Sequence, residues 1–309
     1  MTYKPLTLGW DHGLLAVDRF GGRLGPVLFI LPDGRQVAPL AVAPWFSEDI
    51  DHSHQPLFHR LRGEWPCVPF GKDTSHGHGA SHDWDVLEAS DTCIRLAIAY
   101  PAGHPIARLE RTIRPLPDRP AIDLELLIEA RSDCRLPVGL HPSLGAGPWL
   151  IDLPPETLVA TYPHPPTPNS IISPGCFAPI ASVPTSDGGS IVARHFPPGV
   201  PAEELLQVLE AKGRATLVNT SDAYRLDLTW NADHFPSLVL WISHRALTAP
   251  PWNGRVSMLG VEPVCSAFDL GTAVSQGENP INNRGINTAL ALRAGQTFST
   301  HYRLAAELV

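Results

Sequence analysis

Short runs of apolar residues recur along the whole chain, and several of them alternate with polar residues. Between residues 121 and 129 (AIDLELLIE), Ile122, Leu124 and Leu126 alternate with Asp123 and Glu125. A period of two places the apolar side chains on one face, as in a β-strand with one face in the core and one in solvent. Comparable strand-like runs occupy residues 14–17, 27–31, 94–100, 205–209, 215–219, 225–230 and 238–243.

Proline and glycine separate these runs. The 309 residues include 33 prolines and 25 glycines, spread over the full length. Because proline blocks helix interiors, few long helices are expected. Residues 201–209 are ambiguous, since a proline followed by acidic residues is typical of a helix start, whereas 205–209 has strand character. Many short strands between turns predict an all-β sandwich or barrel.

Domain organisation follows from the same distribution. Proline-rich stretches at 153–168 and 196–201 have the composition of surface loops. Strand-like segments continue on both sides of each stretch without a change of composition. The sequence therefore predicts one domain over residues 1–309.

Composition and charge exclude several classes of protein. A hydrophobic fraction of 43% and a charged fraction of 17% are typical of soluble globular chains. The net charge of −8 argues against nucleic acid or an anionic membrane as partner. Five scattered cysteines without a CxxC pair favour free thiols in a reducing compartment. Together with the lack of a signal-peptide pattern or a long apolar stretch, this predicts a cytoplasmic protein, either a monomer or a homodimer.

A histidine cluster is the first candidate for chemistry. His76, His78 and His82 are side chains of the type that most often binds transition metals. However, the intervening glycines favour a loop, and no matching carboxylate motif follows. A metal site is therefore less favoured than a metal-free sugar site or a surface loop, and no metal or cofactor is expected.

His141 and Glu262 each precede a proline, which biases their backbone toward extended geometry. Glu262 follows the apolar run 258–261, and a carboxylate among apolar neighbours costs free energy unless it is paired. It therefore serves either chemistry or a buried ion pair. For His141, this context alone slightly favours a hydrogen-bonded structural role over a catalytic one.

Tryptophans lie close to these segments, among them Trp65, Trp84 and Trp252. Sugars present apolar C–H faces that stack on aromatic rings, while their hydroxyls need fixed polar partners. For any single tryptophan, however, a place in the hydrophobic core is the favoured interpretation.

Taken in order, four segments resemble the aldose 1-epimerase family, most closely its glucose-6-phosphate 1-epimerase-like branch. They are residues 62–71 (RGEWPCVPFG), 76–84 (HGHGASHDW), 139–145 (GLHPSLG) and 259–263 (LGVEP). The resemblance implies a large antiparallel β-sandwich of the galactose mutarotase-like type.

The same resemblance implies a function. The chain would interconvert the α and β anomers of an aldose by opening and closing the ring, with Glu262 as an ionised base and His141 as a protonated acid. Arg62, His76 and Trp84 would bind the sugar. The alternatives are a non-catalytic carbohydrate-binding or sensing module on the same fold, and a different sugar enzyme, such as a lyase or isomerase, on a related β-sandwich.

Two positions depart from the branch and bear on the substrate, and one further family residue has two candidates in this chain. Ala80 stands where the branch has an arginine, and His78 where it has an aromatic residue, so a sugar phosphate is not implied. Family members also use an aspartate between the two catalytic residues, for which Asp227 and Asp233 are both candidates.

Overall fold

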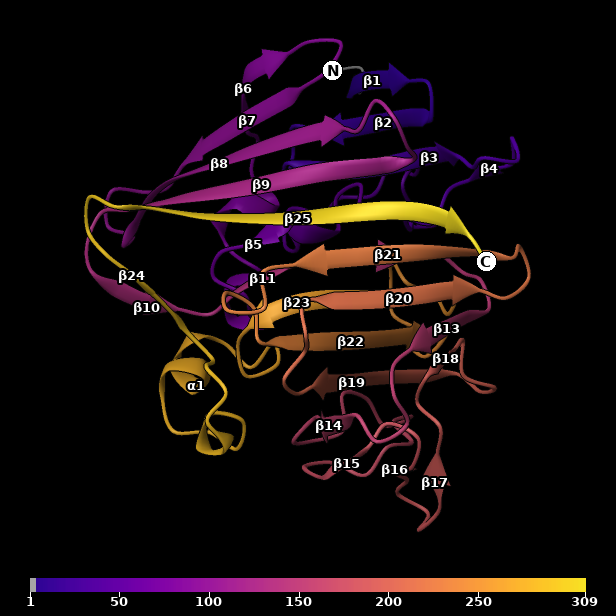
Figure 1. Ribbon diagram of the computed structural model, residues 1–309. Coiled ribbons are helices and arrows are strands. Elements are labelled where there is room, and N and C mark those ends of the chain that lie inside the picture. The colour runs from indigo at the N-terminus through magenta and orange to yellow at the C-terminus, as the bar shows by residue number, and fades with distance from the viewer. Residues whose placement is uncertain (1–3) are drawn as a thin grey trace.

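The computed structural model describes residues 4–309, and two large antiparallel sheets dominate it. The nine-stranded sheet has the order β18-β13-β20-β21-β25-β9-β8-β7-β6. Its strands are β18 (His195–Phe196), β13 (Trp149–Asp152), β20 (Arg214–Asn219), β21 (Tyr224–Trp230), β25 (Thr297–Leu308), β9 (Ala121–Ala130), β8 (Ile106–Pro115), β7 (Ile94–Ala99) and β6 (Asp85–Ala89). Figure 1 shows β8, β9 and β25 running side by side across this sheet.

The second sheet carries the candidate site. Its main path has the order β15-β14-β19-β22-β23-β11-β5, and β12 pairs with β23 off this path. Its strands are β15 (Phe177–Pro179), β14 (Leu158–Thr161), β19 (Ala202–Val208), β22 (Ser237–His244), β23 (Ser257–Cys265), β11 (Val138–Leu140), β5 (Pro66–Cys67) and β12 (Ser143–Leu144).

Smaller elements complete the fold. A four-stranded sheet is formed by β1 (Leu6–Trp10), β2 (Gly13–Asp18), β3 (Arg23–Ile30) and β4 (Gln36–Val37). Two further strand pairs are β10 (Cys134–Leu136) with β24 (Leu290–Leu292), and β16 (Val183–Pro184) with β17 (Ser190–Ile191). The helices are short: α1 (Thr272–Gln276) and the 3₁₀ turns Pro56–Phe58, Lys72–Thr74, His78–Ser81 and Asn282–Arg284.

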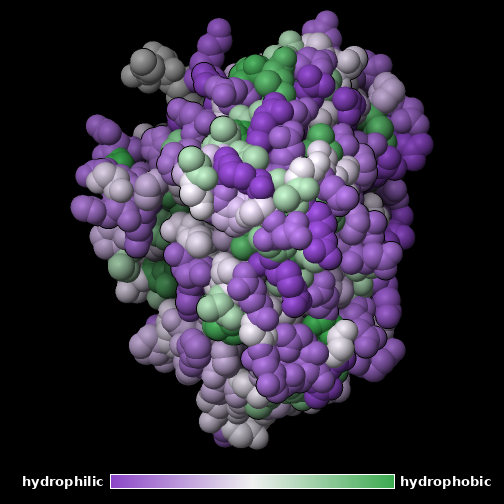
Figure 2. Space-filling model, turned by 90° about the vertical axis from the view of Figure 1, so that its left-hand side faces the viewer, coloured by the Kyte–Doolittle hydropathy of each residue, from purple (hydrophilic) through white to green (hydrophobic). Residues whose placement is uncertain are grey.

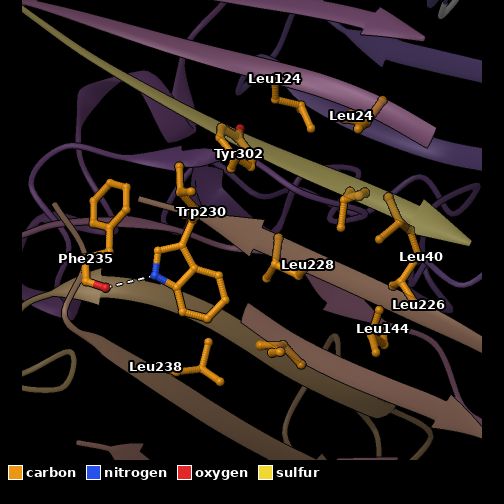
Figure 3. Close-up of a cluster of buried hydrophobic side chains, with 14 of the residues drawn as sticks. Leu24, Leu40, Leu124, Leu144, Leu226, Leu228, Trp230, Phe235, Leu238 and Tyr302 are labelled. Carbon is orange, nitrogen blue, oxygen red and sulfur yellow. Dashed lines mark hydrogen bonds between the residues drawn. The ribbon is translucent and has the colours of Figure 1, made fainter. Parts of the chain in front are cut away.

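The two large sheets share one hydrophobic core. Leu228 and Trp230 of the nine-stranded sheet belong to the same buried cluster as Leu238 of the eight-stranded sheet. Figure 3 shows these side chains together, with the Trp230 indole donating a hydrogen bond of 2.8 Å to the carbonyl of Phe235. The chain is therefore a sandwich, as predicted.

The opposite face of the eight-stranded sheet carries a second, smaller apolar cluster. Along β23, Leu259 and Val261 belong to the main core, whereas Met258 and Val264 belong to the second cluster. Since side chains alternate along a strand, Gly260 and Glu262 lie on the second face. The chain thus uses one face of this sheet for the core and leaves the other for a site.

The strands predicted from the sequence are all present, and their ends differ from the prediction by a few residues at most. The ambiguous segment 201–209 is a strand, β19, and not a helix. The stretch 153–168 is not all loop, because it contains β14. Figure 2 shows one face of the molecule, where hydrophilic residues predominate and hydrophobic ones are scattered. No helix within residues 4–309 combines the length and apolar character needed to cross a membrane.

Candidate active site

A cleft of about 280 Å³ lies on the second face of the eight-stranded sheet. Antiparallel pairing builds its floor: Leu205 of β19 pairs with Trp241 of β22, which pairs with Gly260 of β23. Loops that precede or follow the strands supply its walls. The polar side chains lining it are Lys72, His76, His141, Tyr162, Thr167, Glu203, Glu262 and Asp269, and its aromatic ones include Trp65, Trp241 and Trp252.

His141 lies directly after β11 and is held on three sides. Its backbone N–H donates to the carbonyl of Trp65 at 2.9 Å, and its ring stacks on the Trp65 indole with 4.1 Å between centroids. The ring nitrogen Nδ1 lies 3.2 Å from the Ser143 hydroxyl. These contacts leave Nε2 directed at the neighbouring carboxyl, 3.3 Å from Oε1 of Glu262.

The Glu262 carboxyl folds back over Gly260, two residues earlier on β23. A Cβ atom at position 260 would stand only 2.1 Å from Oε1 of Glu262 and 3.0 Å from Cβ of Trp241. A side chain of any size would therefore occupy the place of the carboxyl. Glycine at this position is a requirement of the site, not of the strand.

Burial sets the proton distribution in this pair. Removal from water raises the pKa of Glu262 well above 4.5, and the charge of Asp269 adds to the shift. Burial lowers the pKa of His141 well below 6.5, with smaller contributions from His76 and Arg23. Burial therefore disfavours the charged form of both groups. Both shifts run against the ionised base and protonated acid implied by the family resemblance.

His76 joins the pair from the loop after β5. Its ring meets the His141 ring edge-on, with 5.2 Å between centroids, and also packs against Phe70. The backbone there is tightly constrained, since His76 has φ +62° and Gly77 φ +93°. A Cβ atom at Gly77 would lie 2.1 Å from the carbonyl of Val68. The loop is therefore fixed and presents the His76 imidazole to the cleft.

The other two histidines of the cluster lie elsewhere. His78 and His82 stack on each other with 3.8 Å between centroids, and neither lines the cleft. Within residues 4–309, no group of three His, Cys, Asp or Glu side chains is placed to hold a metal ion. A metal site built from all three histidines of the cluster thus has no geometric support.

Arg62 and Trp84 also lie outside the cleft. The Arg62 guanidinium is buried, 3.3 Å from the Asp18 carboxylate and over the ring of Phe46. Trp84 is fully buried in the main core, where its indole donates to the carbonyl of Gly79 at 2.8 Å. Contact of either side chain with a sugar has no support in this geometry, although the resemblance implies it for both.

Glu203 is a further acidic side chain in the cleft, and the sequence analysis did not identify it. The Trp241 indole donates to its Oε1 at 2.6 Å, and burial raises its pKa to about 7. Of the two aspartates considered, Asp227 is ion-paired with Arg214 and Asp233 is exposed, and neither lines the cleft. The alternation of side chains along β19 could have identified Glu203, since it places this residue on the same face as Leu205 and Gln207.

Several solved structures share this fold. A candidate aldose 1-epimerase from Escherichia coli K12 superposes with a TM-score of 0.64 at 14% sequence identity, over 99% of each chain. A galactose mutarotase-like protein from Lactobacillus casei gives a TM-score of 0.62 at 14% identity, covering 98% of this chain and all of the other. An aldose epimerase homologue from C. elegans gives 0.62 at 11% identity over the whole of both chains.

The chain has the galactose mutarotase-like fold. At identities this low, the agreement concerns the fold and not the reaction. No family model matches the sequence. No curated protein matches it either. The match does not single out the glucose-6-phosphate 1-epimerase-like branch within the mutarotase-like proteins.

Proposed function

We propose that this protein is an aldose 1-epimerase, which interconverts the α and β anomers of a sugar in the cleft described above. The observation that carries the proposal is the contact between His141 and Glu262, 3.3 Å apart at the base of a cleft walled by tryptophans. An acid and a base beside one another, with room for a single sugar ring, match the requirements of the reaction.

The reaction transfers two protons, and it breaks and re-forms one bond. The base removes the proton of the anomeric hydroxyl while the acid protonates the ring oxygen, so that the bond between C1 and the ring oxygen breaks and an aldehyde forms. Rotation about C1–C2 and the reverse proton transfers close the ring on the other face. The total number of protons on the enzyme is unchanged after each turnover.

One shared proton is sufficient for this cycle. Transfer of the Glu262 proton to Nε2 of His141 gives a carboxylate and an imidazolium, which are the base and the acid implied by the family resemblance. Because both arrangements hold the same number of protons, the pH dependence of the rate reports the pair and not either residue alone. General acid–base catalysis of this kind contributes about 10²- to 10⁴-fold to a rate.

The surrounding side chains suit a sugar ring. The indoles of Trp65, Trp241 and Trp252 offer apolar surface to C–H faces, while His76 and Glu203 offer hydrogen-bonding atoms to hydroxyls. Both polar groups are fixed, His76 by its loop and Glu203 by the Trp241 indole. Fixed polar groups between aromatic walls are typical of sites that recognise a small, rigid, hydroxylated molecule.

The Glu262→Gln variant tests the proposal. Loss of the carboxyl removes the proton that the pair shares, so anomer exchange should fall by at least about 10²-fold while the fold persists. Polarimetry on freshly dissolved α-glucose and α-galactose measures the rate, and Glu129→Gln on the outer face of β9 serves as the control. Full activity of Glu262→Gln would refute the assignment. A wild-type protein that binds sugar without exchanging anomers would instead be a binding module.

A further inference from the structure

Three side chains from distant segments form a closed ring of hydrogen bonds at the cleft. The Lys72 ammonium donates to the Tyr162 hydroxyl at 2.7 Å, and that hydroxyl donates to Oδ1 of Asp269 at 2.7 Å. The backbone closes the ring, because the N–H of Lys72 donates to the carbonyl of Asp269 at 2.9 Å. All three residues line the cleft beside the proposed catalytic pair.

Hydrogen bonds from β19 fix the loop that carries Asp269. Gln207 of β19 is fully buried, accepts a hydrogen bond of 2.7 Å from the N–H of Phe268 and donates one of 2.8 Å to the carbonyl of Ser266. Phe268 has φ +48°, a conformation that non-glycine residues seldom adopt. Its ring meets the Tyr162 ring edge-on. A buried amide and a strained backbone together keep Asp269 at the cleft.

The ring leaves hydrogen-bonding capacity unused. An ammonium has three N–H donors, and Lys72 uses one of them on Tyr162. Among the described residues, Asp269 accepts a side-chain hydrogen bond only at Oδ1, from Tyr162, which leaves Oδ2 available. The cleft therefore presents a donor and an acceptor side by side, on a rigid support.

Charge determines which ligand group fits. Lys72 is the only lysine or arginine among the described residues that line the cleft, and the Tyr162 hydroxyl links its ammonium to the Asp269 carboxyl group. Glu203 and Glu262 add two further carboxyl groups to the same walls. An uncharged group that both donates and accepts suits such a surface, as two neighbouring hydroxyls do. A phosphate would meet the Asp269 carboxyl group and a single cation that is already hydrogen-bonded to Tyr162.

We propose that Lys72, Tyr162 and Asp269 form a subsite for a pair of adjacent, non-anomeric hydroxyls, and that this subsite selects an uncharged aldose over its phosphate. The inference rests on the proposed function, because it assigns the part of the substrate that the catalytic pair does not contact. Lys72 and Asp269 act here as specificity-determining residues.

Calorimetric binding measurements test the subsite without requiring turnover. For the wild type we expect glucose or galactose to bind, and one or two monodeoxy sugars to bind at least about tenfold more weakly, since each lost hydroxyl removes a hydrogen bond to a charged group. Glucose 6-phosphate should bind more weakly than glucose. The Asp269→Asn and Lys72→Gln variants should weaken binding of the parent sugar and abolish its advantage over the same deoxy sugar. Lys212→Gln, which changes an exposed lysine outside the cleft, should bind like the wild type.

Several outcomes would overturn the subsite. The first is equal affinity for the parent and all deoxy sugars, and the second is a higher affinity for glucose 6-phosphate than for glucose. The third is a loss of affinity for the deoxy sugar that is as large in both variants as in the wild type. The proposed function fails separately, when sugars bind as expected but polarimetry shows no anomer exchange. In active protein, the two variants should raise KM with at most a severalfold change in kcat, which distinguishes them from Glu262→Gln.

Discussion

At the scale of single residues, the site places ionisable groups where their charged forms are disfavoured. Glu262 and His141 are both almost inaccessible to solvent, at 2% and 6% exposure. Burial disfavours the charged form of each, because it raises the pKa of Glu262 and lowers that of His141. An acid and a base held 3.3 Å apart need little reorganisation to exchange a proton.

Burial of the carboxyl has a consequence for stability. The pKa of Glu262 lies well above its ordinary value of 4.5 in the folded protein. Below pH 4.5 the folded and unfolded states both hold the proton, and the stabilisation is complete. As the pH rises through the folded-state pKa, the unfolded chain has already lost its proton, and the free energy of unfolding decreases.

The Glu262→Gln variant lacks this dependence. Its melting temperature should therefore exceed that of the wild type by an amount that grows as the pH rises above 4.5. Thermal denaturation followed by circular dichroism across this range measures the difference, with Glu129→Gln as the control. A difference that stays constant or shrinks with rising pH would show that Glu262 is not a buried, protonated group.

At the scale of elements, one strand couples the core to the site. Leu259 and Val261 of β23 pack into the main core, while Gly260 and Glu262 form part of the cleft. The pairing of β23 with β12 and β22 fixes its register, and a shift of one residue would exchange the two faces. Catalytic geometry and core packing therefore depend on the same strand register.

Substitution of Gly260 by alanine should disable the site without unfolding the sheet. The added Cβ would stand 2.1 Å from Oε1 of Glu262 and must displace the carboxyl from His141. A misplacement of about 1 Å costs about 10²-fold in rate, and polarimetry should show a loss of that size with a nearly unchanged melting temperature. Gly9→Ala in β1, where the nearest atom lies at 3.7 Å, should remain fully active. Normal activity of Gly260→Ala would contradict the placement of the carboxyl.

The sequence allowed the individual strands to be predicted, but not all of the site. Alternation identified β9 and β21 because their polar and apolar residues separate cleanly, whereas β22 was identified as a continuous apolar run. The acidic residues in β19 instead suggested a helix start, although Glu203 and Glu204 point to opposite faces. Asp269 follows the fourth motif closely, but Lys72 and Tyr162 belong to no motif, and the three side chains meet only through tertiary structure. Motif order located His76, His141 and Glu262, whereas Arg62 and Trp84 belong to the same motifs and lie outside the cleft.

At the scale of the whole molecule, a buried polar cluster ties the nine-stranded sheet to the segment beside the site. Arg111 of β8 and the Tyr302 hydroxyl of β25 both bind the carboxylate of Glu64, which immediately precedes Trp65. All three side chains lie in the interior. The cluster therefore fixes the wall on which His141 stacks.

Removing one member of this cluster should be costly. Arg111→Met leaves the buried Glu64 carboxylate without its cation, and the free energy of unfolding should fall by about 3–5 kcal/mol. Combining it with Glu64→Gln removes the unpaired charge and should restore part of the loss. Urea denaturation of the two single variants and the double variant measures these differences. If the double variant loses more free energy of unfolding than the two single variants lose together, the interpretation is contradicted.

The stack of His141 on Trp65 also gives the protein an optical readout of its own chemistry. Three of its eight tryptophans line the cleft, and one of these lies face to face with the imidazole that receives a proton in the proposed mechanism. Entry of a sugar changes the polarity around all three indoles, and protonation of the imidazole changes the electric field across one of them. Intrinsic fluorescence should therefore report occupancy and proton position from within the unmodified chain.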